Sequence, residues 1–183
     1  KFDKELLIDV KIEDGAQVKP GDVAMVVSGK IRSLLQTERL MLNVMQRMSG
    51  IATVTHKYQS LLKGTHTKVL DTRKTTPGMR VLEKMAVKIG GGENHRMGLF
   101  DMILLKDNHV DFAGGIKNAI ERCHKYIEET GKKLKIEIEV RNFEELQEVL
   151  EHGGVNRIML DNFTVPDTRK ACLLYTSPSP RDA

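Results

Sequence analysis

After Gly64 the chain alternates short β-rich segments with helical segments, and this alternation constrains the fold more than any other feature. Four strands are predicted, at residues 67–72, 102–106, 134–140 and 158–160. Helical periodicity is predicted between them, at residues 76–89, 115–131 and 142–150. Strands that alternate with helices imply right-handed crossovers and a parallel sheet, either doubly wound or a barrel. Four strands cannot close a barrel, so either the sheet is open or residues beyond this chain supply the rest.

The first 62 residues follow a different pattern. Residues 1–30 contain short alternating apolar segments separated by turn residues such as Asp14-Gly15, which predicts a small β unit. From Ile31 to Leu62 apolar residues recur at helical spacing, and Ser49-Gly50 interrupts them. We therefore predict a helix, a break at Ser49-Gly50, and a second helix.

Both ends of the chain look unusual. It opens with Lys1 rather than Met, so we expect it to lack its natural start. After Ala171 a helical pattern gives way to CLLYTSPSPRDA, in which Pro178 and Pro180 oppose regular structure. This string resembles a translated sequencing adapter. Residues 172–183 are therefore expected to be an artefactual, disordered tail, with a genuine Pro/Ser tail as the alternative.

Composition excludes several classes of protein. The 183 residues include 29 Lys and Arg against 25 Asp and Glu and are 40% hydrophobic, which is typical of a globular protein rather than a disordered one. No apolar stretch approaches the roughly 20 residues of a membrane span. Two cysteines cannot build a disulfide framework, so we expect a reducing cytoplasm. Aromatic residues are only 4%, too few for a platform that stacks nucleic-acid bases.

Charged residues gather just after the predicted strands, where ligands bind in parallel α/β folds. Cationic and polar residues follow the first strand or lie next to the second: Thr72, Arg73, Lys74, His95, Arg96 and Lys106. Acids end the third and fourth strands, Glu139 and Asp161. A single such cation is usually a solvated surface charge. Their joint placement instead favours binding of a polyanion, with the acids facing a developing cation, sugar hydroxyls or hydrated magnesium.

Glu137 and Glu139 occupy the same face of the third predicted strand, because side chains alternate along a strand. An inward acid in a parallel sheet is costly unless it is paired, so Glu139 favours a functional role; a strand predicted out of phase is the alternative.

Three familiar motifs are absent. Gly29-Lys30 lacks the earlier glycine of a phosphate-binding loop, since position 24 is Ala24. Gly90-Gly91-Gly92 follows a helix rather than a strand, so it is not a dinucleotide-binding motif. His95 and His109 lack zinc-protease spacing, and we predict no metal ligands among the side chains.

Six segments, in order over nearly all of residues 5–171, closely resemble the quinolinate phosphoribosyltransferase family. They are ERLMLNVMQRMSGIAT (38–53), LDTRKTTPGMR (70–80), GGGENHRMGL (90–99), LLKDNH (104–109), EIEV (137–140) and LDNF (160–163). The resemblance implies transfer of phosphoribose from phosphoribosyl pyrophosphate to quinolinate, with loss of carbon dioxide and pyrophosphate and formation of nicotinate mononucleotide. It also implies Mg²⁺ as cofactor and a place in NAD biosynthesis.

The resemblance further implies the fold and the assembly. An N-terminal α/β sandwich portion would occupy residues 1–62, and an incomplete, TIM-like parallel α/β barrel, truncated here, would begin with four β/α units over residues 63–171. The family works as a homodimer, and the glycine-rich segments that help hold the phosphoribosyl phosphate have no counterpart in this chain. This chain is therefore expected to be inactive by itself.

Site residues follow from the resemblance motif by motif. Arg39 resembles the arginine that reaches into the neighbouring subunit's site. Thr72, Arg73, Lys74, His95, Arg96 and Lys106 resemble the residues that bind substrate, and Glu139 and Asp161 resemble the acids near the ribose and metal. Lys74, Lys106, Glu139 and Asp161 are the predicted catalytic residues. The alternatives are a related phosphoribosyltransferase with another acidic aromatic substrate, and a basic nucleic-acid-binding domain, which would bind duplexes with a steep salt dependence.

Overall fold

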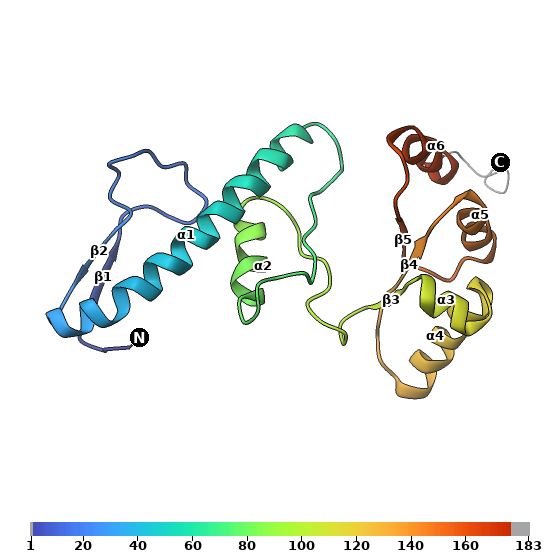
Figure 1. Ribbon diagram of the computed structural model, residues 1–183, viewed down its shortest axis with the longest axis horizontal. Coiled ribbons are helices and arrows are strands. Elements are labelled where there is room, and N and C mark those ends of the chain that lie inside the picture. Colours follow the sequence, from blue (N-terminus) through green and yellow to red (C-terminus); the bar gives the residue numbers. More distant parts are fainter. Residues whose placement is uncertain (1, 177–183) are drawn as a thin grey trace. The chain divides into compact units, whose positions relative to one another are not determined.

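The computed structural model describes residues 2–176, which divide into two compact units, one that ends at Arg96 and one that begins at Met97 (Figure 1). We call them unit 1 and unit 2 and describe each by itself. The fold is mixed α/β. No helix within residues 2–176 combines the length and the apolar character that crossing a membrane requires.

Unit 1 begins with the predicted small β unit. Strands β1 (Leu7–Val10) and β2 (Met25–Ser28) pair antiparallel, with Leu7 opposite Ser28 and Val10 opposite Met25. The turn residues between them lie in the connecting loop, as their φ preferences predict.

A single helix, α1 (Ile31–Leu61), follows, so the predicted break at Ser49-Gly50 was wrong. One interior glycine costs a helix only about 1 kcal/mol, which the flanking helical turns outweigh. The close approach of two helices occurs elsewhere. A Cβ atom at Gly90 would collide with the main chain of Ala52 and with Thr55 of α1, so glycine at position 90 lets the two segments touch.

Helix α2 (Arg80–Ile89) ends before Gly90 as predicted but starts later than the predicted residue 76. Residues 76–79 form a turn in which Gly78 has φ +75°, a conformation incompatible with a continuing helix.

The first predicted strand, residues 67–72, is not a strand. Its only β pairing within the described residues is a parallel bridge between Leu70 and Glu93. The Gln59 side chain of α1 takes the place of a strand partner, because its amide accepts from Val69 N at 3.0 Å and donates to Thr67 O at 3.4 Å. The prediction of four strands in a row is therefore corrected to one bridge and three strands.

Unit 2 contains the other three predicted strands. They form a parallel sheet in the order β3 (Ile103–Leu105), β4 (Ile136–Val140), β5 (Arg157–Leu160). The helices are α3 (Asp107–Ala113), α4 (Ile116–Thr130), α5 (Phe143–His152) and α6 (Val165–Thr176). The short helix α3 was not predicted. The cap of α5 is as expected, since the Asn142 side chain accepts from Glu145 N at 2.8 Å.

The hydrophobic core of unit 2 lies on one face of this sheet. Ile138 and Val140 of β4 and Ile120 of α4 are each 0% exposed and belong to one cluster that also includes residues of α3, α5 and α6. Because side chains alternate along a strand, Lys106, Glu137, Glu139 and Arg157 occupy the opposite face. The sheet thus has one apolar face under helices and an opposite face, called here the charged face, on which these four side chains lie together with Leu104 and Met159.

The expected disordered tail is partly helical. Helix α6 continues through Cys172–Thr176, since these residues include no Pro or Gly to end it. The rest of the predicted tail, with Pro178 and Pro180, lies outside the described residues.

Candidate active site

The bridge between Leu70 and Glu93 brings together two of the segments predicted to bind substrate. Glu93 N donates to Val69 O at 2.8 Å, and Asp71 N donates to Glu93 O at 3.2 Å. The two chains run parallel at this point, so Thr72-Arg73-Lys74 and His95-Arg96 emerge beside each other. This pairing, rather than a complete strand, places the predicted cations of unit 1 in one neighbourhood.

A buried network ties the roots of these two segments to α2. The Asp71 carboxylate pairs with the Lys84 ammonium and accepts from the Asn94 side-chain amide. The side chains of Lys84 and Asp71 are only 1% and 7% exposed. The main chain of His95 joins them, because its N–H donates to Asp71 Oδ1 at 2.9 Å and its carbonyl accepts from Lys84 Nζ at 3.2 Å.

The Thr72–Thr76 segment is held by the first turn of α2 and by its own main chain. Arg80 donates from Nη2 to the Arg73 carbonyl and from Nε to the Thr75 hydroxyl, both at 3.3 Å. Lys74 N donates to the Thr72 hydroxyl at 3.1 Å. These bonds fix the backbone and leave the Thr72 and Lys74 side chains exposed.

Glu83 connects the end of this segment to α1. Its carboxylate accepts from Arg47 Nε at 2.9 Å and from Thr76 N at 3.2 Å, while Arg47 also donates to the Thr76 hydroxyl at 3.2 Å. The hydrogen bond with Thr76 and the Arg47 charge lower the pKa of the Glu83 carboxyl, against the effect of its burial.

Unit 1 therefore presents a cationic group on a rigid support. Arg73, His95 and Arg96 are half-buried, and Lys74 is exposed. Guanidinium groups on fixed backbone are suited to carboxylates and phosphates. Arg39 lies apart from this group in the sequence, on α1, and its exposed side chain forms no hydrogen bond or ion pair with the part of the chain that the structure describes.

In unit 2 the predicted catalytic lysine and glutamate are in contact. Lys106 Nζ lies 2.8 Å from Glu139 Oε1 and 3.1 Å from Oε2, between the ends of β3 and β4. Glu139 is 14% exposed and Lys106 is 45% exposed, so the lysine reaches solvent. His109 orients the start of α3, because its Nδ1 accepts from Lys106 N at 3.0 Å.

Asp161 lies directly after β5, next to the end of β4. Its N–H donates to Val140 O at 2.9 Å, which fixes its backbone, and its side chain is exposed. Asn162, with φ 56°, donates to Asp161 Oδ2 at 2.9 Å. Lys106, Glu139 and Asp161 thus end three neighbouring strands, as the strand-end rule predicts.

Glu137 also faces away from the helices, and it is 1% exposed. Arg157 of β5 lies beside it in the register, with Nη1 3.4 Å from Glu137 Oε2. The charged face therefore pairs each inward acid with a cation from the adjacent strand.

Among the described residues, no group of three or more His, Cys, Asp or Glu side chains could hold a metal ion. Magnesium in phosphate chemistry keeps most of its waters and needs only one or two carboxylates. The exposed Asp161 beside Glu139 fits that requirement.

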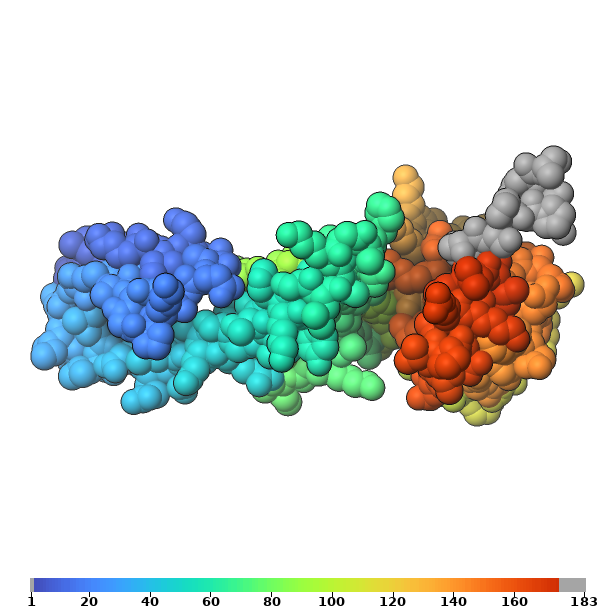
Figure 2. All heavy atoms as spheres, turned by 90° about the horizontal axis from the view of Figure 1, so that it is seen from above, coloured from blue at the N-terminus to red at the C-terminus, as the bar shows by residue number. Residues whose placement is uncertain are grey.

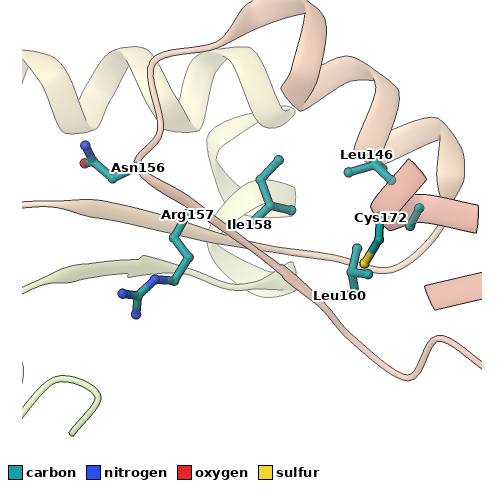
Figure 3. A pocket seen from close by; sticks show the side chains of 7 residues that line it. Leu146, Asn156, Arg157, Ile158, Leu160 and Cys172 are labelled. Atoms are coloured by element: carbon teal, nitrogen blue, oxygen red, sulfur yellow. The ribbon is translucent and has the colours of Figure 1, made fainter. Parts of the chain in front are cut away.

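An apolar groove in unit 2 does not belong to this set. Leu146, Ile158, Leu160, Ala171 and Cys172 line most of it, with Asn156 and Arg157 at its rim. Figure 3 shows Leu146, Leu160 and Cys172 gathered at one end, while Arg157 extends on the other side of β5 from Ile158. The groove lies on the helix-covered face, so its chemistry is that of core packing.

Sequence reasoning missed the supporting residues Lys84, Glu83 and Arg157. An unusual feature of α2 marks the first two: the helix buries Glu83 and Lys84 while Val81 is 67% exposed. Adjacent charged residues on a short helix are normally read as solvent-facing, so only the tertiary contacts identify them.

Comparison with known proteins agrees with the six motifs. A family model for the C-terminal domain of quinolinate phosphoribosyl transferase matches residues 51–181, and the N-terminal domain model matches residues 2–49. The chain is 45% identical over 172 residues to a tobacco (Nicotiana tabacum) protein named quinolinate phosphoribosyltransferase (decarboxylating) 1b, covering 91% of this chain and 48% of that one. A probable nicotinate-nucleotide pyrophosphorylase (carboxylating) of Archaeoglobus fulgidus is 44% identical over 162 residues, covering 87% and 60%.

Solved structures give the same result. The crystal structure of NadC from Streptococcus pyogenes superposes with a TM-score of 0.87 at 39% identity, over 96% of this chain and 61% of that one. The nicotinate-nucleotide pyrophosphorylase from Francisella tularensis gives 0.86 at 40% identity, over 94% and 60%. The chain spans about half the length of the tobacco relative. Because both family models match and together cover most of the sequence, the chain belongs to the quinolinate phosphoribosyltransferase family.

Proposed function

We propose that the protein transfers phosphoribose from phosphoribosyl pyrophosphate to quinolinate, giving nicotinate mononucleotide, pyrophosphate and carbon dioxide in NAD biosynthesis. The observation that carries this proposal is the bridge between Leu70 and Glu93, which gathers Arg73, His95 and Arg96 on one support. Quinolinate carries two adjacent carboxylates, and a fixed group of several donors matches such a dianion better than it matches a monoanion.

The cations of unit 1 bind and orient quinolinate in this proposal. Arg73, His95 and Arg96 hold its two carboxylates, and Thr72 and Lys74 complete the polar surface. Lys106 contributes a further positive charge. Fixing both carboxylates restricts the ring, so its nitrogen is directed at the ribose carbon rather than rotating freely.

The acids of unit 2 stabilise the positive charge of the sugar. The ring nitrogen forms a bond to the first ribose carbon while the bond from that carbon to pyrophosphate breaks, and pyrophosphate leaves with the electron pair. Cationic character develops on the ribose, and Glu139 and Asp161 stabilise it electrostatically. Lys106, 2.8 Å from Glu139, holds that carboxylate in a fixed orientation.

Decarboxylation follows from the new positive charge on the ring. The bond between the ring and the neighbouring carboxylate breaks, its electron pair stays on the ring carbon next to the nitrogen, and carbon dioxide leaves. That carbon then takes a proton from solvent. Mg²⁺, held through water by Asp161 and Glu139, would supply charge neutralisation on the pyrophosphate.

The proposal includes the predicted architecture and assembly. Residues 1–62 form part of the N-terminal sandwich, and residues 63–171 begin an incomplete, TIM-like barrel of parallel β/α units. A homodimer is supported by the surface of α1, whose 31 residues include only one buried residue, Thr55. Large apolar residues such as Leu35, at 67%, and Val54, at 54%, are exposed, and much of the helix is open to view in Figure 2. Arg39 on this helix is assigned to the partner's site.

We place the protein in the cytoplasm, although a similar Arabidopsis thaliana protein is named chloroplastic. That location remains a prediction to be checked in cells.

Replacing Arg96 by Ala tests the proposed activity. The protein is expressed from its full reading frame and assayed for carbon dioxide release from carboxyl-labelled quinolinate, with and without phosphoribosyl pyrophosphate. We expect release to need both substrates and to fall about a hundredfold in Arg96→Ala, the usual cost of one lost preorganised charge. Arg122→Ala, an exposed arginine on α4 away from the proposed site, is the matched control.

Two results would contradict the proposal. Unchanged turnover in Arg96→Ala would remove the carboxylate-binding role. Turnover of nicotinate in preference to quinolinate would favour the related phosphoribosyltransferase with a different acidic aromatic substrate.

A further inference from the structure

A buried ion pair lies beneath both segments that carry the cations of unit 1. Lys84, 1% exposed, comes from α2, and Asp71, 7% exposed, immediately precedes Thr72. Taking two charges out of water is costly, and a buried pair is on average no more stabilising than apolar side chains of similar volume. Its location therefore points to a role other than simple stabilisation.

The pair holds the main chain of His95 at both of its hydrogen-bonding groups. Asp71 Oδ1 accepts from His95 N at 2.9 Å, and Lys84 Nζ donates to His95 O at 3.2 Å. A backbone fixed on both sides restricts the side chain of His95 and the start of Arg96, because neither peptide group can turn without breaking a charge-assisted hydrogen bond.

The Asn94 side chain also binds both members of the ion pair. Its side-chain amide donates to the other oxygen of Asp71 and to the Lys84 carbonyl, the latter at 2.8 Å. Both carboxylate oxygens are thus bound, so Asp71 cannot rotate. The orientation of Asp71 in turn sets where the Thr72–Lys74 segment leaves the bridge.

We propose that Lys84 and Asp71, with Asn94, are positioning residues that set the spacing between Arg73 and the His95-Arg96 pair. This inference rests on the proposed function, since it assigns that spacing to recognition of two carboxylates on one ring. The pair is too buried to touch a substrate, and it acts through the backbone. Its loss affects a dicarboxylate more than a monocarboxylate, because only the dicarboxylate depends on the distance between two binding segments.

Lys84→Met tests this, because methionine keeps an unbranched stem and removes the charge. Lys88→Met is the matched control, an exposed lysine one turn further along α2. In the protein from the full reading frame, we expect Lys84→Met to raise the KM for quinolinate roughly tenfold or more, the scale of effect that slight misplacement of binding groups produces. The KM for phosphoribosyl pyrophosphate and both constants of Lys88→Met should stay unchanged. A purely structural role would instead lower the melting temperature and leave the KM for quinolinate as it is, which would overturn the proposal.

Neutralising both partners of the ion pair should restore binding of quinolinate. In Asp71→Asn/Lys84→Met the unpaired buried charge is gone and an oxygen that accepts from His95 N remains, so we expect the KM for quinolinate to fall back toward the unmodified value. If the double variant instead raises the KM for quinolinate by the product of the factors seen in the two single variants, the two residues act independently and the proposed coupling between them is contradicted. If Lys84→Met does not fold, Asn94→Ala carries the same test, since Asn94 is only partly buried and the ion pair remains.

Amide hydrogen exchange separates this inference from the proposed function. In Lys84→Met the His95 amide should exchange faster, while the Glu93 amide, bonded to Val69 O at 2.8 Å, should not change. Equal acceleration of both amides would show that the pair only stabilises unit 1. If the His95 amide responds alone but the unmodified protein does not turn over quinolinate, the proposed function fails and the positioning role stands.

Discussion

Replacing Glu83 by Gln measures how firmly the Thr72–Thr76 segment is anchored. The Glu83 carboxylate accepts from Arg47 Nε at 2.9 Å and Nη2 at 2.8 Å, and from Thr76 N at 3.2 Å. Glutamine keeps the size but loses the charge and presents an NH₂ group to one of these donors. Hydrogen bonds to a charged group contribute about 1.5–3 kcal/mol. The Arg47 side chain is 53% exposed, so water can hydrate its guanidinium group when the Glu83 charge is lost. We therefore expect a cost in the lower part of that range, about 2 kcal/mol.

This loss of stability is large enough to be measured as a shift in the melting temperature. Unfolding entropy is about 2.1 cal/mol/K per residue, or roughly 0.2 kcal/mol/K for a unit that ends at Arg96. A change of about 2 kcal/mol in the free energy of unfolding therefore lowers the melting temperature of unit 1 by about 10 °C. Far-UV circular dichroism follows it well, since α1 and α2 supply the helical signal of this unit.

The pH dependence tests the electrostatic cause. Thr76 and Arg47 lower the pKa of the Glu83 carboxyl in the folded protein relative to 4.5. A lowered folded pKa means that the stabilisation is fully present above 4.5 and is lost as the pH falls through the lower folded value. The difference between the unmodified protein and Glu83→Gln should therefore shrink in acid. A difference that stays constant across this range, or an equal loss in the exposed control Glu38→Gln, would refute the reasoning.

Three further predictions concern unit 2. Glu139→Gln should lower kcat of the protein from the full reading frame about a hundredfold, because the charge that stabilises the ribose cation is lost; unchanged kcat would assign that role elsewhere. Ile138→Ala, at a side chain 0% exposed, should cost about 2–5 kcal/mol in denaturant unfolding, and a much smaller loss would mean that the core collapses around the gap. Iodoacetamide at mildly alkaline pH should modify exposed Cys172 faster than Cys123, because burial raises the pKa of the Cys123 thiol, as peptide mass mapping would show; equal rates would contradict this.

Local sequence signals predicted most of the regular elements of unit 2, with α3 as the exception. Strands β3, β4 and β5 appear as short β-rich runs, and α4 ends at Gly131 as predicted, because periodicity and helix stops act over a few residues. The strand-end rule then selected Lys106 and Asp161, which directly follow β3 and β5, and Glu139, which lies near the end of β4 between them. In unit 1 the same rule was applied to a strand that is not present, and its residues reach His95 through the Leu70–Glu93 bridge instead.

What the sequence by itself determined is the family and the approximate positions of β3, β4, β5, α4 and α5, since these depend on motifs and on local pattern. It also predicted which charged side chains carry the proposed chemistry. Only the tertiary structure decided that α2 turns Glu83 and Lys84 inward and that Arg157 pairs with Glu137. Each of these depends on a partner distant in the chain. A charge is buried only where folding brings its partner within hydrogen-bond reach, and no local periodicity records that contact.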